Sequence, residues 1–172
     1  FLNPSPALIK EYEETFSRLQ EMRKRIEQDA HAGVGPGELD VELSANIGFP
    51  ADVEMARTYG LRDAGLFRTE FTFMGYDHWP TAAEQEEVYL RVAQGFAGTV
   101  TIRTLDIGGD KFLPYFTFPR EDNPLLGLRS IRFSMEYLDL FRDQIRAILA
   151  GWARGARFRI LLPMVSNIWE VE

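Results

Sequence analysis

The chain has 172 residues, of which 45% are hydrophobic and 26% are charged, and its formal net charge is −7. A chain with this apolar content can bury a core, whereas disordered chains combine low hydrophobicity with high net charge. The excess of acidic residues argues against a nucleic-acid partner, because phosphate binding requires a basic face. The absence of cysteine excludes disulfides, thiolate zinc sites and a cysteine catalyst within these residues.

We expect neither a membrane span nor a secretory signal peptide in this sequence. No apolar run approaches the roughly 18–20 residues that a membrane span requires. The first residues, Phe1 to Pro4, lack the basic and apolar regions of a secretory signal peptide. The chain does not begin with Met, and it stops in mid-pattern at residues 169–172. We therefore expect both ends to lie within a longer protein.

Residues 4–30 predict a long amphipathic helix. Turn and cap residues precede it, and apolar side chains then recur every three or four positions, at Leu8, Tyr12, Phe16, Leu19, Met22 and Ile26. This apolar stripe is expected to pack on the same domain or on a partner. The Gly/Pro-rich segment 31–37 indicates a linker. We accordingly expect residues 1–40 to form a linker helix with its linker, and residues 41–172 to form a separate domain.

From residue 41 onward, short apolar runs alternate with longer helical patterns. Strands are predicted over 41–47, 64–71, 99–106 and 158–164. Helices are predicted over 51–59, over 81–94, and in two pieces up to Gly155 that break near 135–139, with a further helix capped by Asn167. Thr81 and Glu84 predict a capping box. Such alternation indicates βαβ units with a parallel sheet, and four units fit either a flavodoxin-like open sheet or part of a (β/α)8 barrel.

Two predicted strands carry an arginine near the carboxyl end, which is the functional edge of a parallel sheet. Alternation places Arg68 on the more polar face of its strand and Arg103 on the more polar face of the next. A buried guanidinium needs a compensating anion, and its planar fork binds phosphate or carboxylate bidentately. Internal pairing is the other interpretation, with Glu70 or Asp106 as the partner of Arg68 and with Asp106 or Asp110 as the partner of Arg103.

The period of two also divides the second predicted strand into two faces. One face is predicted to hold Ala64, Leu66, Arg68 and Glu70, and the other to hold Gly65, Phe67, Thr69 and Phe71. On the third strand, Val100 and Ile102 are expected to meet the helices.

Two later segments add further cationic candidates. Lys111 ends the glycine-rich loop 106–111, where backbone N–H groups could approach an oxyanion, although a tight turn with a solvated lysine is favoured by the residues alone. Residues 123–132 are expected to open a helix with Arg129 and Arg132 on one face, and ligand binding and solvation are equally compatible with that pair.

Neither histidine has a metal-ligand spacing or a partner for nucleophilic catalysis in the sequence. His31 lies in the predicted linker, and His78 lies in the polar and aromatic segment 75–80. Both are expected to be surface residues.

Three segments together, 64–71, 102–111 and 123–132, resemble the phosphoenolpyruvate (PEP)-binding domain of the PEP–protein phosphotransferases. This family comprises Enzyme I of the bacterial sugar phosphotransferase system and its nitrogen-related paralogue. Segments 44–48, 80–85 and 162–164 follow in matching order, so the resemblance covers the whole chain. Pyruvate phosphate dikinase and PEP synthase share a looser version of these motifs.

The resemblance implies a (β/α)8 TIM barrel whose carboxyl mouth holds PEP and Mg²⁺. Family members transfer the phosphoryl group of PEP to a histidine of their own swivelling domain, and then to a phosphocarrier protein in the cytoplasm. Arg68, Arg103 and Arg129 match the substrate-binding arginines, and Lys111 is a weaker candidate. The resemblance also implies a homodimer.

The departures from the family pattern concern the catalytic groups. The accepting histidine would precede residue 1, and the acidic Mg²⁺ ligands and the proton-donating cysteine would follow residue 172. We therefore expect no catalytic residue and no metal ligand in this chain, which would be inactive alone. Residues 41–172 amount to about half of the roughly 250 residues of a full barrel. The alternatives are a dimerisation module without substrate binding, or a fragment of a dikinase or synthase relative.

Overall fold

The computed structural model describes residues 3–31, 41–108, 111 and 113–171. The chain divides into two compact units, one of Phe1–Glu42 with Thr58–Gly60 and the other of Leu43–Arg57 with Leu61–Glu172. The glycine/proline linker lies outside the described residues, as do Gly109 and Asp110 of the glycine-rich loop. The division predicted at residues 40 and 41 stays a prediction.

The first unit consists mainly of α1, Pro6–His31, which matches the helix predicted over 4–30. His31, predicted in the linker, is the last residue of this helix. Apart from the half-buried Leu8, the predicted apolar stripe is exposed, and the rings of Tyr12 and Phe16 stack on each other with centroids 5.8 Å apart. Ion pairs one turn apart join Lys10 to Glu14 and Arg23 to Glu27 along the helix.

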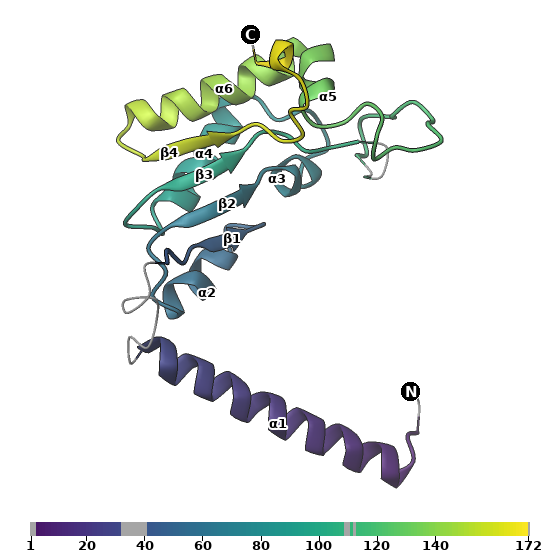
Figure 1. The fold of residues 1–172 in the computed structure, drawn as a ribbon, viewed down its shortest axis with the longest axis vertical. Helices are drawn as coiled ribbons and strands as arrows, with labels where there is room; N and C mark the ends of the chain where they lie inside the picture. The colour runs from purple at the N-terminus through teal and green to yellow at the C-terminus, as the bar shows by residue number, and fades with distance from the viewer. Residues whose placement is uncertain (1–2, 32–40, 109–110, 112, 172) are drawn as a thin grey trace. The chain divides into compact units, whose positions relative to one another are not determined.

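The second unit contains a parallel four-stranded sheet (Figure 1). Its strands, in the order β1-β2-β3-β4, are β1 (Ala45–Ile47), β2 (Ala64–Arg68), β3 (Val100–Arg103) and β4 (Phe158–Leu161). The predicted α/β class with a parallel sheet is therefore confirmed. Spatial order follows chain order, and so the sheet lacks the reversal that defines a flavodoxin-like fold.

Helices follow the strands in the predicted alternation. They are α2 (Asp52–Thr58), α3 (Glu70–Met74), α4 (Ala82–Ala93), α5 (Ile131–Glu136), α6 (Leu138–Ala153) and the 3₁₀ helix η2 (Ile168–Glu170). The Thr81–Glu84 capping box at the start of α4 is confirmed, and the predicted break between α5 and α6 falls at Tyr137. Among the described residues, no helix has the length and apolar content needed to cross a bilayer.

The main core lies between one face of the sheet and the helices α2, α4 and α6. Its largest buried side chains are Phe67 of β2 and Tyr89 of α4, whose rings meet edge to face with centroids 5.9 Å apart. The strands contribute Ile47 and Ile102, and α6 contributes Ile148. This arrangement follows from the period-2 and period-3.6 apolar patterns, because each puts its apolar residues on one side.

The predicted faces hold for β3 but only partly for β2. Val100 and Ile102 are buried against the helices as expected. On β2, Ala64 was predicted on the face opposite Phe67, but both residues are buried in the same core. The cause is a shift in ladder register between Ala64 and Phe67, which breaks strict alternation.

Several predicted element boundaries are wrong, and β1 begins at Ala45 instead of residue 41. β2 ends at Arg68, because Thr69 precedes α3 and Glu70 begins that helix instead of extending the strand. β3 ends at Arg103, well before residue 106, and β4 ends at Leu161. The helix expected from 123 begins only at Ile131, and Asn167 is followed by a 3₁₀ turn.

A second, aromatic core supports the segment that follows β3. Phe73 of α3 and Phe133 of α5 are buried here beside Leu105, Ile107 and Leu113. Trp79, Phe116 and Tyr137 make edge or stacked ring contacts around them. Aromatic packing therefore anchors the described residues between β3 and α5.

Candidate anion-binding site

Arg68 and Arg103 are the last residues of β2 and β3, and the two strands pair them directly in register. Both side chains are half-buried at the carboxyl edge of the sheet. Like charges placed opposite each other on neighbouring strands destabilise a sheet. This edge therefore requires negative charge, supplied by the protein or by a ligand.

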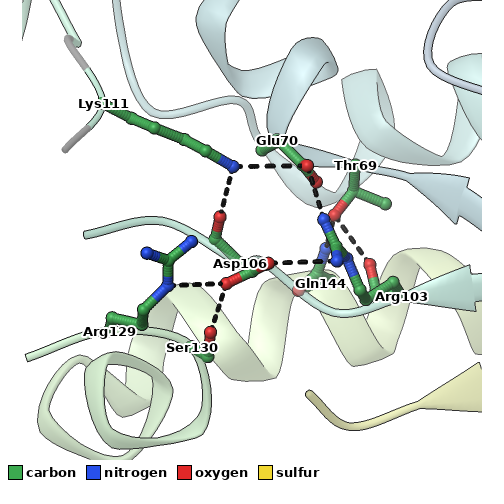
Figure 2. A network of polar contacts seen from close by, with 8 residues as sticks. All are labelled: Thr69, Glu70, Arg103, Asp106, Lys111, Arg129, Ser130 and Gln144. Carbon is green, nitrogen blue, oxygen red and sulfur yellow. Dashed lines mark hydrogen bonds and ion pairs between the residues drawn. The ribbon is translucent and has the colours of Figure 1, made fainter. Parts of the chain in front are cut away.

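Two carboxylates of the chain hold Arg103 (Figure 2). Its Nη2 lies 2.5 Å from Oε1 of Glu70, and its Nη1 lies 3.0 Å from Oδ2 of Asp106. The pairing with Asp106 confirms one of the internal partners predicted for Arg103, whereas Asp110 lies outside the described residues. Glu70 was predicted as a partner of Arg68, but its position at the start of α3 directs it to Arg103.

Arg68 pairs with neither Glu70 nor Asp106, so its predicted internal pairing is wrong. Its guanidinium carbon lies 4.7 Å from the centroid of the Phe71 ring, a cation–π contact. The Phe71 ring in turn packs on the Phe49 ring, and the two ring centroids lie 4.7 Å apart. The Nε of Arg68 is buried and has no hydrogen-bond partner among the described residues. Arg68 is therefore oriented by an aromatic ring and keeps donor capacity for another group.

Lys111 joins the same network from the loop after β3. Its Nζ lies 3.3 Å from Oε1 of Glu70 and donates to the backbone carbonyl of Asp106 at 2.9 Å (Figure 2). The solvated lysine favoured by the sequence is thus wrong. Because Glu70 accepts from both Arg103 and Lys111, it connects the ends of β2 and β3 to this loop.

Arg129 and Ser130 reach the network from the turn before α5. The Nε of Arg129 donates to Oδ1 of Asp106 at 3.1 Å, and the Ser130 hydroxyl donates to the same oxygen. Ser130 has a φ of 53°, a strained backbone conformation for a non-glycine residue. Its N–H donates to the carbonyl of Ile107 at 3.2 Å, which helps to hold that conformation.

The ionisation of Asp106 reflects competing effects. Burial opposes the charged form and by itself would raise the pKa. Hydrogen bonds from Ser130 and Arg129, together with the charges of Arg103 and Arg129, outweigh it and place the pKa of Asp106 below its ordinary value. Asp106 is therefore a carboxylate at neutral pH, and it orients two arginines.

The predicted helical pairing of Arg129 with Arg132 is wrong, because Arg129 precedes α5. Arg132 Nη1 instead donates to the carbonyls of Leu126 and Gly127, at 2.8 and 2.9 Å, and so closes the preceding turn. The exposed position predicted for His78 is confirmed, and its ring nitrogens lie 2.8 Å from Asp77 and 3.1 Å from Glu84. The side chain of His31 lies outside the described part of the structure.

Sequence reasoning missed the supporting roles of Gln144 and Thr69 beneath the site. Gln144 of α6 is buried and contacts Thr69, which directly precedes Glu70. A signal for Gln144 was present, since it occupies the buried stripe of α6 with Ala147, Ile148 and Gly151. A polar residue on an apolar stripe must find hydrogen-bond partners in the interior.

Arg68 has no carboxylate partner among the described residues, whereas Arg103, Lys111 and Arg129 each contact Glu70 or Asp106. No group of three acidic or histidine side chains suited to a metal ion occurs among the described residues. The geometry therefore suits an anion, bound by guanidinium forks at the carboxyl edge of the sheet.

Comparison with known proteins identifies the family. Residues 21–172 match the family described as PEP-utilising enzyme, PEP-binding domain. The chain belongs to this family. It is 43% identical over 171 residues to the phosphoenolpyruvate-protein phosphotransferase of Geobacillus stearothermophilus, an alignment that covers 98% of this chain and 29% of the relative.

Further members of the family have the same name. The phosphoenolpyruvate-protein phosphotransferase of Staphylococcus carnosus is 44% identical over 98% of this chain and 30% of its own length. That of Bacillus subtilis is 41% identical over 99% of this chain and 30% of its own length. The chain thus spans less than a third of the curated relatives it matches, and its resemblance to PEP–protein phosphotransferases is confirmed.

Proposed function

We propose that this chain forms one wall of the PEP site of a PEP–protein phosphotransferase. The observation that carries the proposal is the register of Arg68 with Arg103 at the carboxyl edge of a parallel sheet. PEP presents a phosphate and a carboxylate close together, and a guanidinium fork can bind either group bidentately. An anion between the two arginines would relieve the repulsion that their pairing creates.

The charge network suits phosphoryl transfer, which depends mainly on positioning and on neutralising charge on the phosphoryl oxygens. Glu70 and Asp106 fix the direction of the Arg103 fork before a ligand arrives. Arg68 supplies the donors that no described residue uses, and Lys111 adds a nearby point charge. Arg129 reaches the site through Asp106, and we propose it as the third substrate-binding arginine.

We also propose that residues 41–172 are the first half of a (β/α)8 TIM barrel, preceded by a linker segment over residues 1–40. The sheet has sequential strand order, and α2, α4 and α6 share one core on one of its faces. On the other face, Thr101 and Arg103 are only half-buried. A barrel closed by further strands would place that face in its interior.

The parent protein would supply what this chain lacks. Mg²⁺ does not fit the described residues, because Glu70 and Asp106 already pair with cations and no suitable cluster of three ligands occurs there. We place its ligands outside this chain. The parent would pass the phosphoryl group to a histidine of its swivelling domain, and then to a phosphocarrier protein of a cytoplasmic sugar or nitrogen-related phosphotransferase system. This chain alone would be inactive.

A dimerisation module is the second candidate, and exposed apolar side chains near β4 favour it. Ile160 and Leu161 of this strand are exposed, as are Met164, Ile168 and Trp169 beyond it. β4 is also an outer strand of the described sheet, and an outer strand can pair with another chain. A second copy that covers this region would form a homodimer.

Isothermal titration calorimetry with PEP and Mg²⁺ separates the two candidates. Binding with a millimolar or tighter Kd, lost in Arg68→Ala and retained in Arg146→Ala, supports the PEP site. Arg146 is a suitable control, because its ion pair with Asp143 lies on the exposed side of α6. Absence of binding together with a stable dimer in light scattering would support the dimerisation module instead.

A further inference from the structure

A buried hydrogen-bond chain links the helix layer to the carboxyl edge of the sheet. At its centre, Oε1 of Gln144 accepts from the backbone N–H of Leu105 at 2.9 Å. Its Nε2 donates to the Thr69 hydroxyl at 3.2 Å and to the Tyr89 hydroxyl at 3.1 Å. The Thr69 hydroxyl then donates to the backbone carbonyl of Arg103 at 2.8 Å (Figure 2).

Because this hydrogen-bond chain is buried, each of its polar groups needs a partner within the protein. Thr69 and Tyr89 are 0% exposed and Gln144 is 1% exposed, so water cannot replace a missing partner. Both N–H groups of the Gln144 amide donate, and its oxygen accepts. The Thr69 hydroxyl accepts once and donates once, which fixes the orientation of its proton. A buried network with every member satisfied is rigid and specifies a single arrangement.

The buried hydrogen bonds hold the residues that directly precede the two carboxylates of the site. Thr69 directly precedes Glu70, and Leu105 directly precedes Asp106, the two carboxylates that hold Arg103. Gln144 therefore ties both carboxylate-bearing segments to α6, while Thr69 holds the backbone of Arg103 itself. Each of these hydrogen bonds involves Thr69 or Gln144, and the bond between these two residues connects them.

We propose that Thr69 and Gln144 are positioning residues that set the direction of the Arg103 fork toward the phosphate or carboxylate of PEP. This proposal rests on the proposed function. Neither side chain would touch the ligand, and both would act through Arg103. A small displacement of the fork weakens bidentate binding, because both N–H groups must meet their acceptors at once.

The test compares substitutions at Thr69 in the 172-residue chain. Thr69→Val keeps the shape but removes the hydroxyl, and Thr69→Ser keeps the hydroxyl. We expect PEP to bind roughly three- to tenfold more weakly to Thr69→Val, the equivalent of one buried hydrogen bond, and Thr69→Ser to restore the wild-type Kd. Gln144→Met provides the same comparison if Thr69→Val does not fold.

Tyr115→Phe is the structural control. It removes a hydroxyl that donates to the backbone carbonyl of Phe73 at 2.8 Å, outside this hydrogen-bond chain, and leaves the bonds of Thr69 and Gln144 intact. It should lower stability and leave the Kd for PEP unchanged. An equal loss of PEP affinity in Tyr115→Phe and Thr69→Val would overturn the proposal, as would unchanged affinity in Thr69→Val.

Side-chain NMR of the Arg103 Nε–Hε group provides a readout that needs no ligand. The resonance should shift or broaden in Thr69→Val, return in Thr69→Ser and stay unchanged in Tyr115→Phe. If the wild-type chain binds no PEP, the proposed function fails in this chain, and the Arg103 signal still decides the positioning role. An Arg103 resonance that is identical in wild type and Thr69→Val would then contradict that role.

Discussion

The helix-covered core and the carboxyl edge of the sheet use neighbouring residues of the same strands in opposite ways. Phe67 of β2 is buried in the core, and the next residue, Arg68, lies at the edge. Ile102 and Arg103 make the same pair on β3. The core is stabilised by apolar burial, whereas the edge gathers cationic side chains, of which Arg68 has no carboxylate partner among the described residues. Stability therefore depends on the core positions, and binding on the adjacent edge positions. Substitutions at the two kinds of position should affect these two properties separately.

The largest effect on stability is expected in the core. Phe67→Ala removes a fully buried ring, and should lower the free energy of unfolding by about 3–5 kcal/mol. Urea denaturation measures this loss. Leu149→Ala, at an exposed position of α6, is the control and should change stability by less than about 0.5 kcal/mol. Similar losses in both variants would show that the core does not lie where the structure places it.

At the edge, Asp106→Asn should lower the free energy of unfolding by about 3 kcal/mol at neutral pH, because it removes the carboxylate charge that faces Arg103 and Arg129. The pKa of Asp106 is lower in the folded chain than in the unfolded chain. Its stabilising contribution is therefore present above the unfolded pKa, and is lost as the pH falls through the folded pKa. Urea denaturation at several pH values should show the difference between wild type and variant shrinking in acid.

Asp143→Asn is the matched control for Asp106→Asn, since Asp143 forms a partly exposed ion pair with Arg146. Ion pairs on the surface contribute little to folding stability, so this variant should change the free energy of unfolding by less than about 1 kcal/mol. A difference in the free energy of unfolding between wild type and Asp106→Asn that stays constant down to strongly acidic pH would contradict the charged network.

The smallest effect is expected at His78, a surface residue outside both the helix-covered core and the carboxyl edge of the sheet. Hydrogen bonds to Asp77 and then to Glu84 raise the pKa of His78 above its ordinary value. The contribution of this charge to stability is present below the ordinary pKa, and is lost as the pH rises through the folded pKa. NMR titration should show a raised pKa in wild type, with a larger fall in Asp77→Asn than in Glu84→Gln.

Glu84→Gln is the sharper of these two variants, because glutamine preserves the capping box with Thr81 while it removes the charge. A His78 pKa at or below the ordinary value in the wild-type chain would contradict the geometry of this cluster. The PEP affinity should not change in either variant, since His78 lies on the exposed surface before α4.

The core could largely be predicted from the sequence, whereas the detailed contacts of the edge could not. Val100 and Ile102 are recognisable because β-branched residues at a period of two indicate a strand with one buried face. The pairing of Arg103 with Glu70 depends on two further facts, the register of β2 with β3 and the start of α3 at Glu70. Neither fact has a local signal strong enough to override the strand pattern over 64–71.

The surroundings of Arg129 were also beyond a local prediction. Its contact with Asp106 requires the strained turn at Ser130, which is held by the aromatic core and by hydrogen bonds to residues far away in sequence. The position of Arg129 in a motif was recognisable by resemblance, but its conformation was not. Gln144 shows the opposite case, in which a polar residue on an apolar stripe signals an interior partner without identifying it.

The most direct test of the central claim is a PEP titration followed by NMR of the arginine Nε–Hε groups. We expect the Arg68 and Arg103 resonances to shift together and to fit one Kd, while that of Arg146 stays unchanged. Arg68→Met should abolish the response of Arg103. Resonances of Arg68 and Arg103 that do not move, or that move no more than that of Arg146, would contradict an anion site between these two arginines.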